Sequence, residues 1–193
     1  MHWSQQFYEI IWLDSNEHHG KYSSFDSLLA VDALTSIKTD TSNAFEDLKT
    51  YQSETKDWIF GYLSYDLKNN IEDLSSENYD GVAFPELYFF QPKKIIRIQE
   101  NTIEFNYLNM VDDEIEADYH EILAFNVSEN ATTIENEKGI HIKMRIFKDE
   151  YFRQVNKMLN HIHRGDIYEA NFCQEFFADN YKIDALKTYE KLN

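Results

Sequence analysis

The chain has 193 residues, of which 42% are hydrophobic and 16% aromatic, so it can bury a core and is not intrinsically disordered. Its formal net charge of −17 argues against nucleic acid and anionic membranes as partners, because both require clustered Lys and Arg. A single cysteine, Cys173, excludes an internal disulfide. The first residues lack the regions of a signal peptide and no apolar run approaches membrane-spanning length, so we expect a cytoplasmic protein.

The hydrophobic pattern of the first 125 residues predicts strands interspersed with two helices. The first helix has Ser42 or Thr41 as its cap, and the second opens with acidic residues, which the helix dipole favours. A hairpin is expected where two alternating runs meet at Glu100 and Asn101. The predicted strands are 7–13, 28–37, 58–67, 87–90, 94–98 and 102–108, the predicted helices are 42–54 and 112–125, and the predicted polar connections are 16–20 and 69–81.

Serine, asparagine, threonine and glutamate dominate the segment that follows, which is typical of a linker. We therefore predict an amino-terminal region over residues 1–127, a linker over 128–139 and a second region over 140–193. Internal repeats and low-complexity tracts are not apparent.

The second region carries the most informative pattern of the chain. Phe152, Val155, Leu159 and Ile162 recur at spacings of three and four, which predicts a helix from about residue 149 to Gly165. After this glycine the period changes to two, which predicts a strand over 167–176. One face of this strand would be mixed in polarity, so Glu169, Asn171 and Glu175 are expected to meet either water or partners within the fold.

Other candidate sites receive little support from the residues. Two histidines two positions apart on a helix, His161 and His163, point in different directions and cannot grip one ion together. His18 and His19 lack a third ligand at a suitable spacing, so no metal site is expected in this chain. Cys173 would need an activating base to act as a nucleophile. Glycine-rich nucleotide-binding motifs are absent from the sequence.

The pattern Gly-Asp-x-Tyr-x-x-Asn-x-x-Gln-x-Phe over 165–176 resembles the one that chorismate-using enzymes carry midway along their chains. The resemblance is greatest to aminodeoxychorismate synthase component I, also called para-aminobenzoate synthase component I. Anthranilate synthase component I is similar here but usually lacks an asparagine matching Asn171. The family match at Cys173 implies that this residue packs within the fold. Further segments that resemble the family in order and spacing are 13–15, 22–25, 59–67 and 84–87, so the resemblance spans residues from about 8 to 193.

The resemblance implies an α+β fold of mostly antiparallel sheets packed with helices, the amino-terminal part of an anthranilate synthase component I-like sandwich that is incomplete in this chain. It implies amination of chorismate to 4-amino-4-deoxychorismate, with ammonia from a glutamine amidotransferase subunit. The family's catalytic residues and its Mg²⁺ ligands would lie beyond residue 193. No catalytic or metal residue is therefore assigned in this chain, and the isolated chain is expected to be inactive.

In the family, the segments that match Ser15 and Tyr22, Ser23, Ser24 and Phe25 line a pocket for tryptophan. The chain differs at Ser24, where the family commonly has an arginine, and a short hydroxyl cannot replace a long cation. The alternative interpretation is that Tyr22 and Phe25 are core residues and Ser15 a turn residue. Two alternative functions also stay open at this point, namely anthranilate synthase component I and a non-catalytic module that binds an amino acid.

Overall fold

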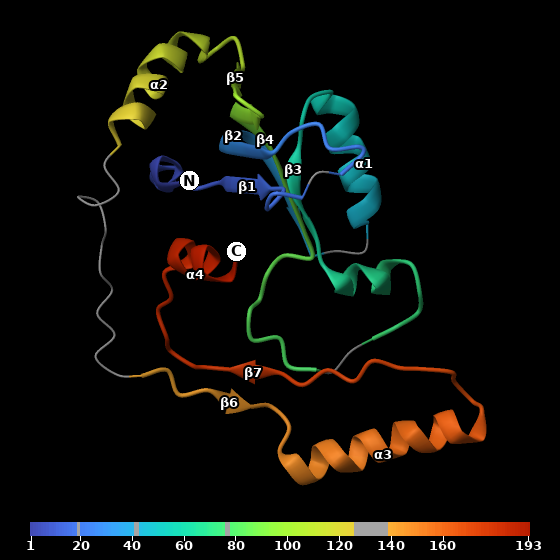
Figure 1. Cartoon of the computed structure of the whole chain (residues 1–193). Helices are drawn as coiled ribbons and strands as arrows, with labels where there is room; N and C mark the ends of the chain where they lie inside the picture. The colour runs from blue at the N-terminus through green and yellow to red at the C-terminus, as the bar shows by residue number, and fades with distance from the viewer. Residues whose placement is uncertain (19, 41–42, 76–77, 126–138) are drawn as a thin grey trace. The chain divides into compact units, whose positions relative to one another are not determined.

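The computed structural model describes residues 1–18, 20–40, 43–75, 78–125 and 139–193. These residues form two compact units, one ending at Phe125 and the other beginning at Gly139 (Figure 1). The predicted linker, 128–139, lies almost entirely outside the described residues, so the division into 1–127 and 140–193 stays a prediction. Among the described helices, none combines the length and the apolar content that crossing a bilayer requires.

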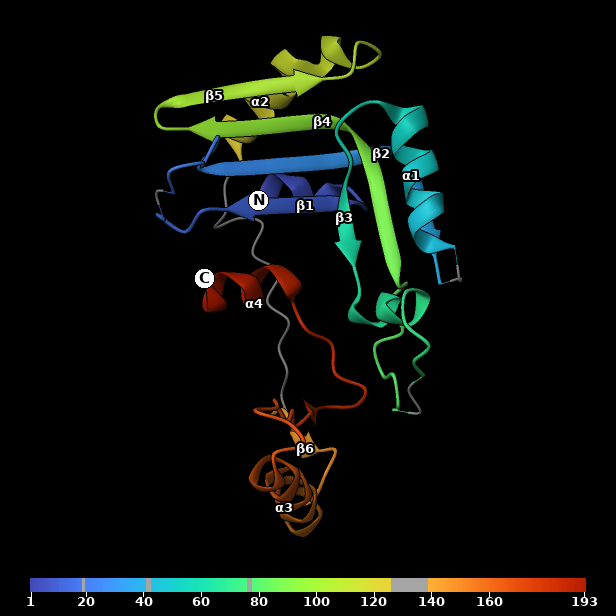
Figure 2. The ribbon, with the colours of Figure 1, turned by 90° about the vertical axis from the view of Figure 1, so that its right-hand side faces the viewer.

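A five-stranded antiparallel sheet forms the frame of the first unit, which confirms the predicted α+β class. The strand order is β1-β2-β4-β3, and β5 pairs with β4 as well. Figure 2 shows β5, β4, β2 and β1 as neighbouring strands. The strands are β1 (Ile10–Asp14), β2 (Ser27–Thr39), β3 (Phe60–Leu63), β4 (Leu87–Gln99) and β5 (Thr102–Tyr107).

Strand β4 joins two segments that the sequence pattern separates at Pro92. Proline has no N–H to donate, so it is unexpected within a central strand. The pairing explains why it is tolerated: β3 pairs with residues 87–90 of β4, β5 pairs with residues 94–99, and Pro92 falls between the two. On its other side Pro92 meets Ala33, where β2 has a register shift. The predicted hairpin at Glu100 and Asn101 is confirmed, since Gln99 pairs with Thr102.

Apolar clusters lie on both faces of this sheet. One contains Trp3 of the amino-terminal turn η1 (His2–Gln6) together with Leu29, Val31 and Ile96. Residues packed against it include Phe7, just after η1, and Ile122 and Phe125, within and just after α2 (Ile115–Ala124). The opposite face carries Leu28, Ala30, Phe60 and Phe90. A third cluster, Ala44, Leu67 and Leu87, joins α1 (Ala44–Thr55) and η2 (Tyr65–Asn70) to β4.

Both predicted helices of the first unit are confirmed, since α1 lies within 44–55 and α2 follows the short 3-10 turn η3 (Asp112–Glu114). The cap of α1 is Asn43, and the predicted cap residues Thr41 and Ser42 lie outside the described residues. Two predicted strands are too long. The first begins at Ile10 because Phe7 follows η1, and the strand predicted over 58–67 ends at Leu63 because η2 turns Leu67 into the third cluster.

In the second unit, the predicted helix is confirmed as α3 (Lys148–Arg164), and Gly165 ends it in the left-handed conformation, with φ 85°. Two short strands, β6 (Lys143–Met144) and β7 (Phe176–Phe177), pair in an antiparallel manner, and α4 (Ala185–Leu192) follows. The long strand predicted over 167–176 is wrong. Residues 167–175 have no strand partner among the described residues, and only Phe176 belongs to a strand.

Candidate functional site

The five residues of the predicted amino-acid pocket lie on the connection between β1 and β2. Ser15 directly follows β1, and its backbone N–H donates a 2.8 Å hydrogen bond to the carbonyl oxygen of Asp26. Its own carbonyl accepts from the N–H of His18 at 2.9 Å. Phe25 is half-buried and packs against the cluster of Leu28, Ala30, Phe60 and Phe90. Ser15 and Phe25 are thus held near one another at one end of the sheet.

The other three predicted pocket residues are exposed. The Tyr22 side chain is 87% exposed, so it is not a core residue, and the Lys21 ammonium lies 5.4 Å from the centre of its ring. Ser23 Oγ accepts a hydrogen bond from the N–H of Gly20 at 3.2 Å, and Ser24 is also exposed. The structure therefore supports the core interpretation for Phe25 and the turn interpretation for Ser15, but not a core role for Tyr22. Whether the five residues bind a ligand stays a prediction.

Two of the family-like segments, 59–67 and 84–87, are brought together on neighbouring strands. The backbone N–H of Ser64 donates to the carbonyl oxygen of Glu86 at 2.8 Å, and Ser64 Oγ donates to the Glu86 carboxylate. The N–H of Glu86 donates in turn to Asp40 at 3.0 Å. Burial, and the nearby Asp40 and Glu86 carboxylates, raise the pKa of the Tyr62 hydroxyl above its ordinary value. These contacts hold the ends of β2, β3 and β4 together.

Position 61 in the same segment requires glycine because the backbones of β3 and β4 approach closely there. A β-carbon at this position would lie 1.9 Å from the carbonyl oxygen of Tyr88 and 2.6 Å from Cα of Phe89. Both atoms belong to the backbone of the neighbouring strand β4, so neither can move aside as a flexible side chain would. The family-like glycine therefore has a structural role in strand pairing.

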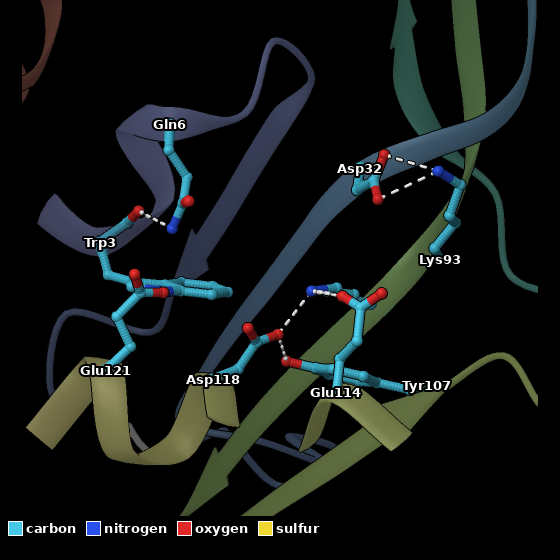
Figure 3. Close-up of polar contacts among 9 residues, drawn as sticks. Trp3, Gln6, Asp32, Lys93, Tyr107, Glu114, Asp118 and Glu121 are labelled. Atoms are coloured by element: carbon cyan, nitrogen blue, oxygen red, sulfur yellow. Dashed lines mark hydrogen bonds and ion pairs between the residues drawn. The ribbon is translucent and has the colours of Figure 1, made fainter. Parts of the chain in front are cut away.

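A buried ion cluster, missed by the sequence analysis, anchors α2 to the sheet. Lys94 on β4 is only 4% exposed, and its ammonium lies 2.6 Å from Asp118 and 2.6 Å from Glu114. The Tyr107 hydroxyl donates to the same Asp118 oxygen at 2.8 Å, as Figure 3 shows. Trp3 reaches α2 separately, because its indole N–H donates to Glu121 at 2.6 Å. A lysine on an inward-facing strand position was the signal in the sequence.

The electrostatics of this cluster keep the lysine charged. Burial alone would lower the pKa of Lys94, but the hydrogen bonds to Asp118 and Glu114 outweigh burial and raise it above its ordinary value. Burial and the hydrogen bond to Asp118 likewise raise the pKa of Tyr107 far above the normal phenol range. A lysine base would need the opposite shift, and the contacts of Lys94 with α2 fit a structural role for the cluster.

In the second unit, polar contacts after Gly165 replace the predicted strand. The N–H groups of Gly165 and Asp166 close the end of α3 on the carbonyls of Ile162 and His161, both at 3.0 Å. Asp166 also accepts from Arg164 Nε at 2.9 Å and lies 2.7 Å from His161 Nδ1. These contacts, the one to Arg164 first, lower the pKa of Asp166. The Gly-Asp pair of the family-like pattern thus forms the carboxyl-terminal cap of α3.

The polar residues predicted on the mixed face after Gly165 are partly exposed to water and partly bonded within the fold. Glu169 and Asn171 are exposed, whereas Glu175 accepts two 2.8 Å hydrogen bonds from Arg145, which lower its pKa. Phe172 packs edge-on against Tyr151 of α3, at 5.3 Å between ring centres. Cys173, interpreted as a packing residue, is exposed, so that interpretation is wrong.

Comparison with known protein families gives a match over nearly the whole chain. The family described as chorismate binding enzyme matches residues 4–193. The chain belongs to this family. The resemblance found in the sequence is therefore confirmed at the level of the chorismate binding enzymes.

Two curated relatives of this chain are named after anthranilate synthase. The "Anthranilate synthase component I-like protein" of Synechocystis sp. is 27% identical over 136 residues, which cover 70% of this chain and 26% of the relative. The "Anthranilate synthase component 1" of Buchnera aphidicola subsp. Pemphigus spyrothecae is 28% identical over 155 residues, covering 75% of this chain and 29% of the relative. The chain thus spans less than a third of the length of these relatives.

Proposed function

We propose that the chain is the amino-terminal portion of an aminodeoxychorismate synthase component I. Such an enzyme replaces the 4-hydroxyl group of chorismate with ammonia, which a glutamine amidotransferase subunit supplies. The product, 4-amino-4-deoxychorismate, leads to para-aminobenzoate and folate. Membership of the chorismate binding enzymes supports the reaction class. The observation that carries the finer assignment is Asn171, because anthranilate synthases usually lack an asparagine at the matching position.

In this proposal the chain supplies structural support for the parent enzyme and performs no chemical step. Among residues 1–18, 20–40, 43–75, 78–125 and 139–193, no group of three or more His, Cys, Asp or Glu side chains is placed to hold a metal ion. The described residues therefore do not fit the Mg²⁺ site that the family implies, and we assign no metal ligand and no proton-transfer group to them. In this proposal those groups belong to other parts of the parent polypeptide.

The proposal predicts the product of the parent enzyme. The full-length polypeptide containing residues 1–193, supplied with chorismate, ammonium and Mg²⁺, should form 4-amino-4-deoxychorismate, identified by chromatography and mass. Chelation of Mg²⁺ should stop the reaction. The isolated 193-residue chain should show no turnover under the same conditions. Anthranilate as the product would contradict the assignment, and turnover by the isolated chain would contradict the scaffold role.

An anthranilate synthase component I is the second candidate, and the names of both curated relatives favour it. The same product assay distinguishes the two, since anthranilate is fluorescent and is released as an aromatic product.

A non-catalytic module that binds an amino acid is the third candidate. Its support is that Ser15 and Phe25 lie close together at one end of the sheet, with the Ser15 N–H bound to the carbonyl of the residue after Phe25.

The third candidate predicts binding of tryptophan that depends on the Ser15 hydroxyl. Calorimetric titration should detect tryptophan binding to the chain, and Ser15→Ala should weaken it by about fivefold, the value expected for one lost hydrogen bond. Ser53→Ala is the matched control, because Ser53 is an exposed serine of α1 whose hydroxyl donates to Thr50. Equal affinities of the parent chain and the Ser15 variant would remove Ser15 from the pocket.

A further inference from the structure

The helix α3 carries an apolar face that its own unit leaves largely uncovered. At 3.6 residues per turn, its apolar side chains fall within one arc of about 120°, and its polar side chains occupy the rest of the circumference. Phe172 packs against Tyr151 at one edge of this arc, whereas Phe152 and Leu159 at the other edge are 51% and 41% exposed. None of the 17 residues of α3 is buried. The apolar face of α3 consists of Tyr151, Phe152, Val155, Met158, Leu159 and Ile162.

The rest of the second unit shows the same lack of cover. No residue of 139–193 is buried, whereas all three buried apolar clusters belong to the first unit. In the described part of the chain, β6 and β7 pair only with each other, and their residues Met144 and Phe176 are 45% and 63% exposed. A two-stranded ribbon is marginally stable unless further strands or a helix pack against it. The second unit therefore presents apolar surfaces that require another layer of structure.

The size of the apolar face of α3 argues against a second copy of the chain as its cover. A helix of 17 residues is about 26 Å long, so a strip about 10 Å wide along it covers roughly 260 Å². Each partner of a stable dimer commonly buries about 800 Å². A segment of the same polypeptide can dock on a smaller area, because its covalent link gives it a high effective concentration. More than two-thirds of each curated relative lies outside the region that this chain matches, which leaves ample polypeptide for such a cover.

We propose that the apolar face of α3 is an intramolecular docking surface, covered in the parent enzyme by an apolar surface of the polypeptide outside residues 1–193. The residues that border the face are Asn156 and His163 on one side and Gln154 and His161 on the other. None of them is a carboxylate, so docking would bury no acidic group in spite of the acidic composition of the chain. The inference rests on the proposed function only in that the chain is a portion of a longer polypeptide.

Hydrogen exchange of the isolated 193-residue chain and of the full-length parent enzyme tests this proposal. The backbone amides of α3 should exchange at least about a hundredfold more slowly in the parent enzyme, because a covered helix opens less often. Helix α1 is the internal control, since Ala44 and Leu48 already pack it against the sheet in this chain, and its exchange should be similar in both proteins. The isolated chain should sediment as a monomer, and exchange of its α3 should not depend on concentration.

Two neighbouring substitutions separate the apolar face from the rest of the helix. Leu159→Asp and Asn160→Asp introduce the same acidic side chain, but only Leu159 belongs to the apolar face, and Asn160 is exposed on the polar side. In the parent enzyme, Leu159→Asp should abolish the slow exchange of α3, whereas Asn160→Asp should leave it nearly unchanged. In the isolated chain the two variants should behave alike. The milder Leu159→Ala should speed exchange of α3 in the parent enzyme by at least about tenfold, which keeps the test valid if the aspartate variant does not fold.

The proposal is overturned if α3 exchanges equally fast in both proteins, if its exchange is already slow in the monomeric isolated chain, or if Leu159→Asp and Asn160→Asp are equivalent in the parent enzyme. Slow exchange that appears in the isolated chain only when its concentration is raised would overturn it as well, because a second copy would then be the cover. Anthranilate as the product would leave this inference intact, and equal exchange of α3 would leave the product assignment intact. The two proposals therefore fail separately.

Discussion

Replacing Lys94 with methionine should lower the free energy of unfolding of the first unit by about 3 to 5 kcal/mol, the range found when one partner of a buried ion pair is removed. The methionine would fill most of the space of the lysine stem. However, Asp118 would keep its negative charge in a site where it is only 12% exposed, with the Tyr107 hydroxyl as its remaining described partner. Glu114 is 49% exposed and can turn to water, so Asp118 is the source of the cost.

Urea denaturation followed by circular dichroism measures this effect. Lys49→Met is the matched control, because Lys49 is an exposed lysine of α1 whose ion pair with Glu46 is 3.7 Å long, and it should change stability by less than about 0.5 kcal/mol. The double variant Lys94→Met with Asp118→Leu should recover part of the loss, since it removes the uncompensated charge as well. A Lys94→Met protein as stable as the Lys49→Met control would show that the cluster does not anchor α2.

Gly61→Ala should destabilise the sheet by about 3 kcal/mol or more, at the upper end of the cost of overpacking a core position. The added methyl group would lie 1.9 Å from the carbonyl oxygen of Tyr88, which is far inside contact distance. Because this oxygen and the nearby Cα of Phe89 are backbone atoms of β4, relief requires β3 and β4 to separate. Separation would weaken the four paired positions that hold β3 in the sheet.

The midpoint temperatures of thermal unfolding of the Gly61→Ala and Gly139→Ala variants, compared with that of the parent chain, test this prediction. Gly139 is the matched control, since a β-carbon there has nothing within 4 Å. The Gly139 variant should unfold at nearly the parent temperature, and the Gly61 variant well below it. If both variants unfold at the parent temperature, the close approach of β3 and β4 does not contribute to stability as described.

The contacts of Gly61 and its neighbours change how the family-like segments are interpreted. Gly61, Ser64 and Glu86 belong to segments that resemble the chorismate-using enzymes, and in this chain they join strand β3 to strand β4. The Gly165 and Asp166 pair likewise closes α3. In the described residues, these motifs therefore specify how strands and a helix end are joined, which is consistent with a scaffold portion of a chorismate binding enzyme.

Elements stabilised by local interactions could be predicted from the sequence. The helix α3 follows from apolar spacing and ends at a glycine with φ 85°, because glycine adopts this conformation without steric cost. The β4–β5 hairpin follows from two alternating runs around Glu100, which itself has a positive φ of 51°. In each case the residues that determine the structure lie within a few positions of one another.

The strand predicted after Gly165 shows where period-two alternation misleads. Alternation from Tyr168 to Phe176 is compatible with an extended chain, but a strand also needs a neighbour for its backbone hydrogen bonds. Among the described residues of this segment, only Phe176 and Phe177 pair with a strand, β6, and the carbonyl of Glu175 accepts from the N–H of Arg145. Side-chain contacts also hold the segment, such as Gln174 to the carbonyl oxygen of Ile146 at 3.0 Å.

The sequence by itself determined the helices α1, α2 and α3, the hairpin, the antiparallel α+β class and the membership of the chorismate binding enzymes, because periodicity and turn residues are properties of nearby residues and motifs are read directly in the sequence. Only the tertiary structure decided that Lys94 is buried between β4 and α2 and that Pro92 is tolerated within β4. These features depend on pairs far apart along the chain. Their partners are chosen by strand register and by helix packing against the sheet, which the pattern of a single segment does not specify.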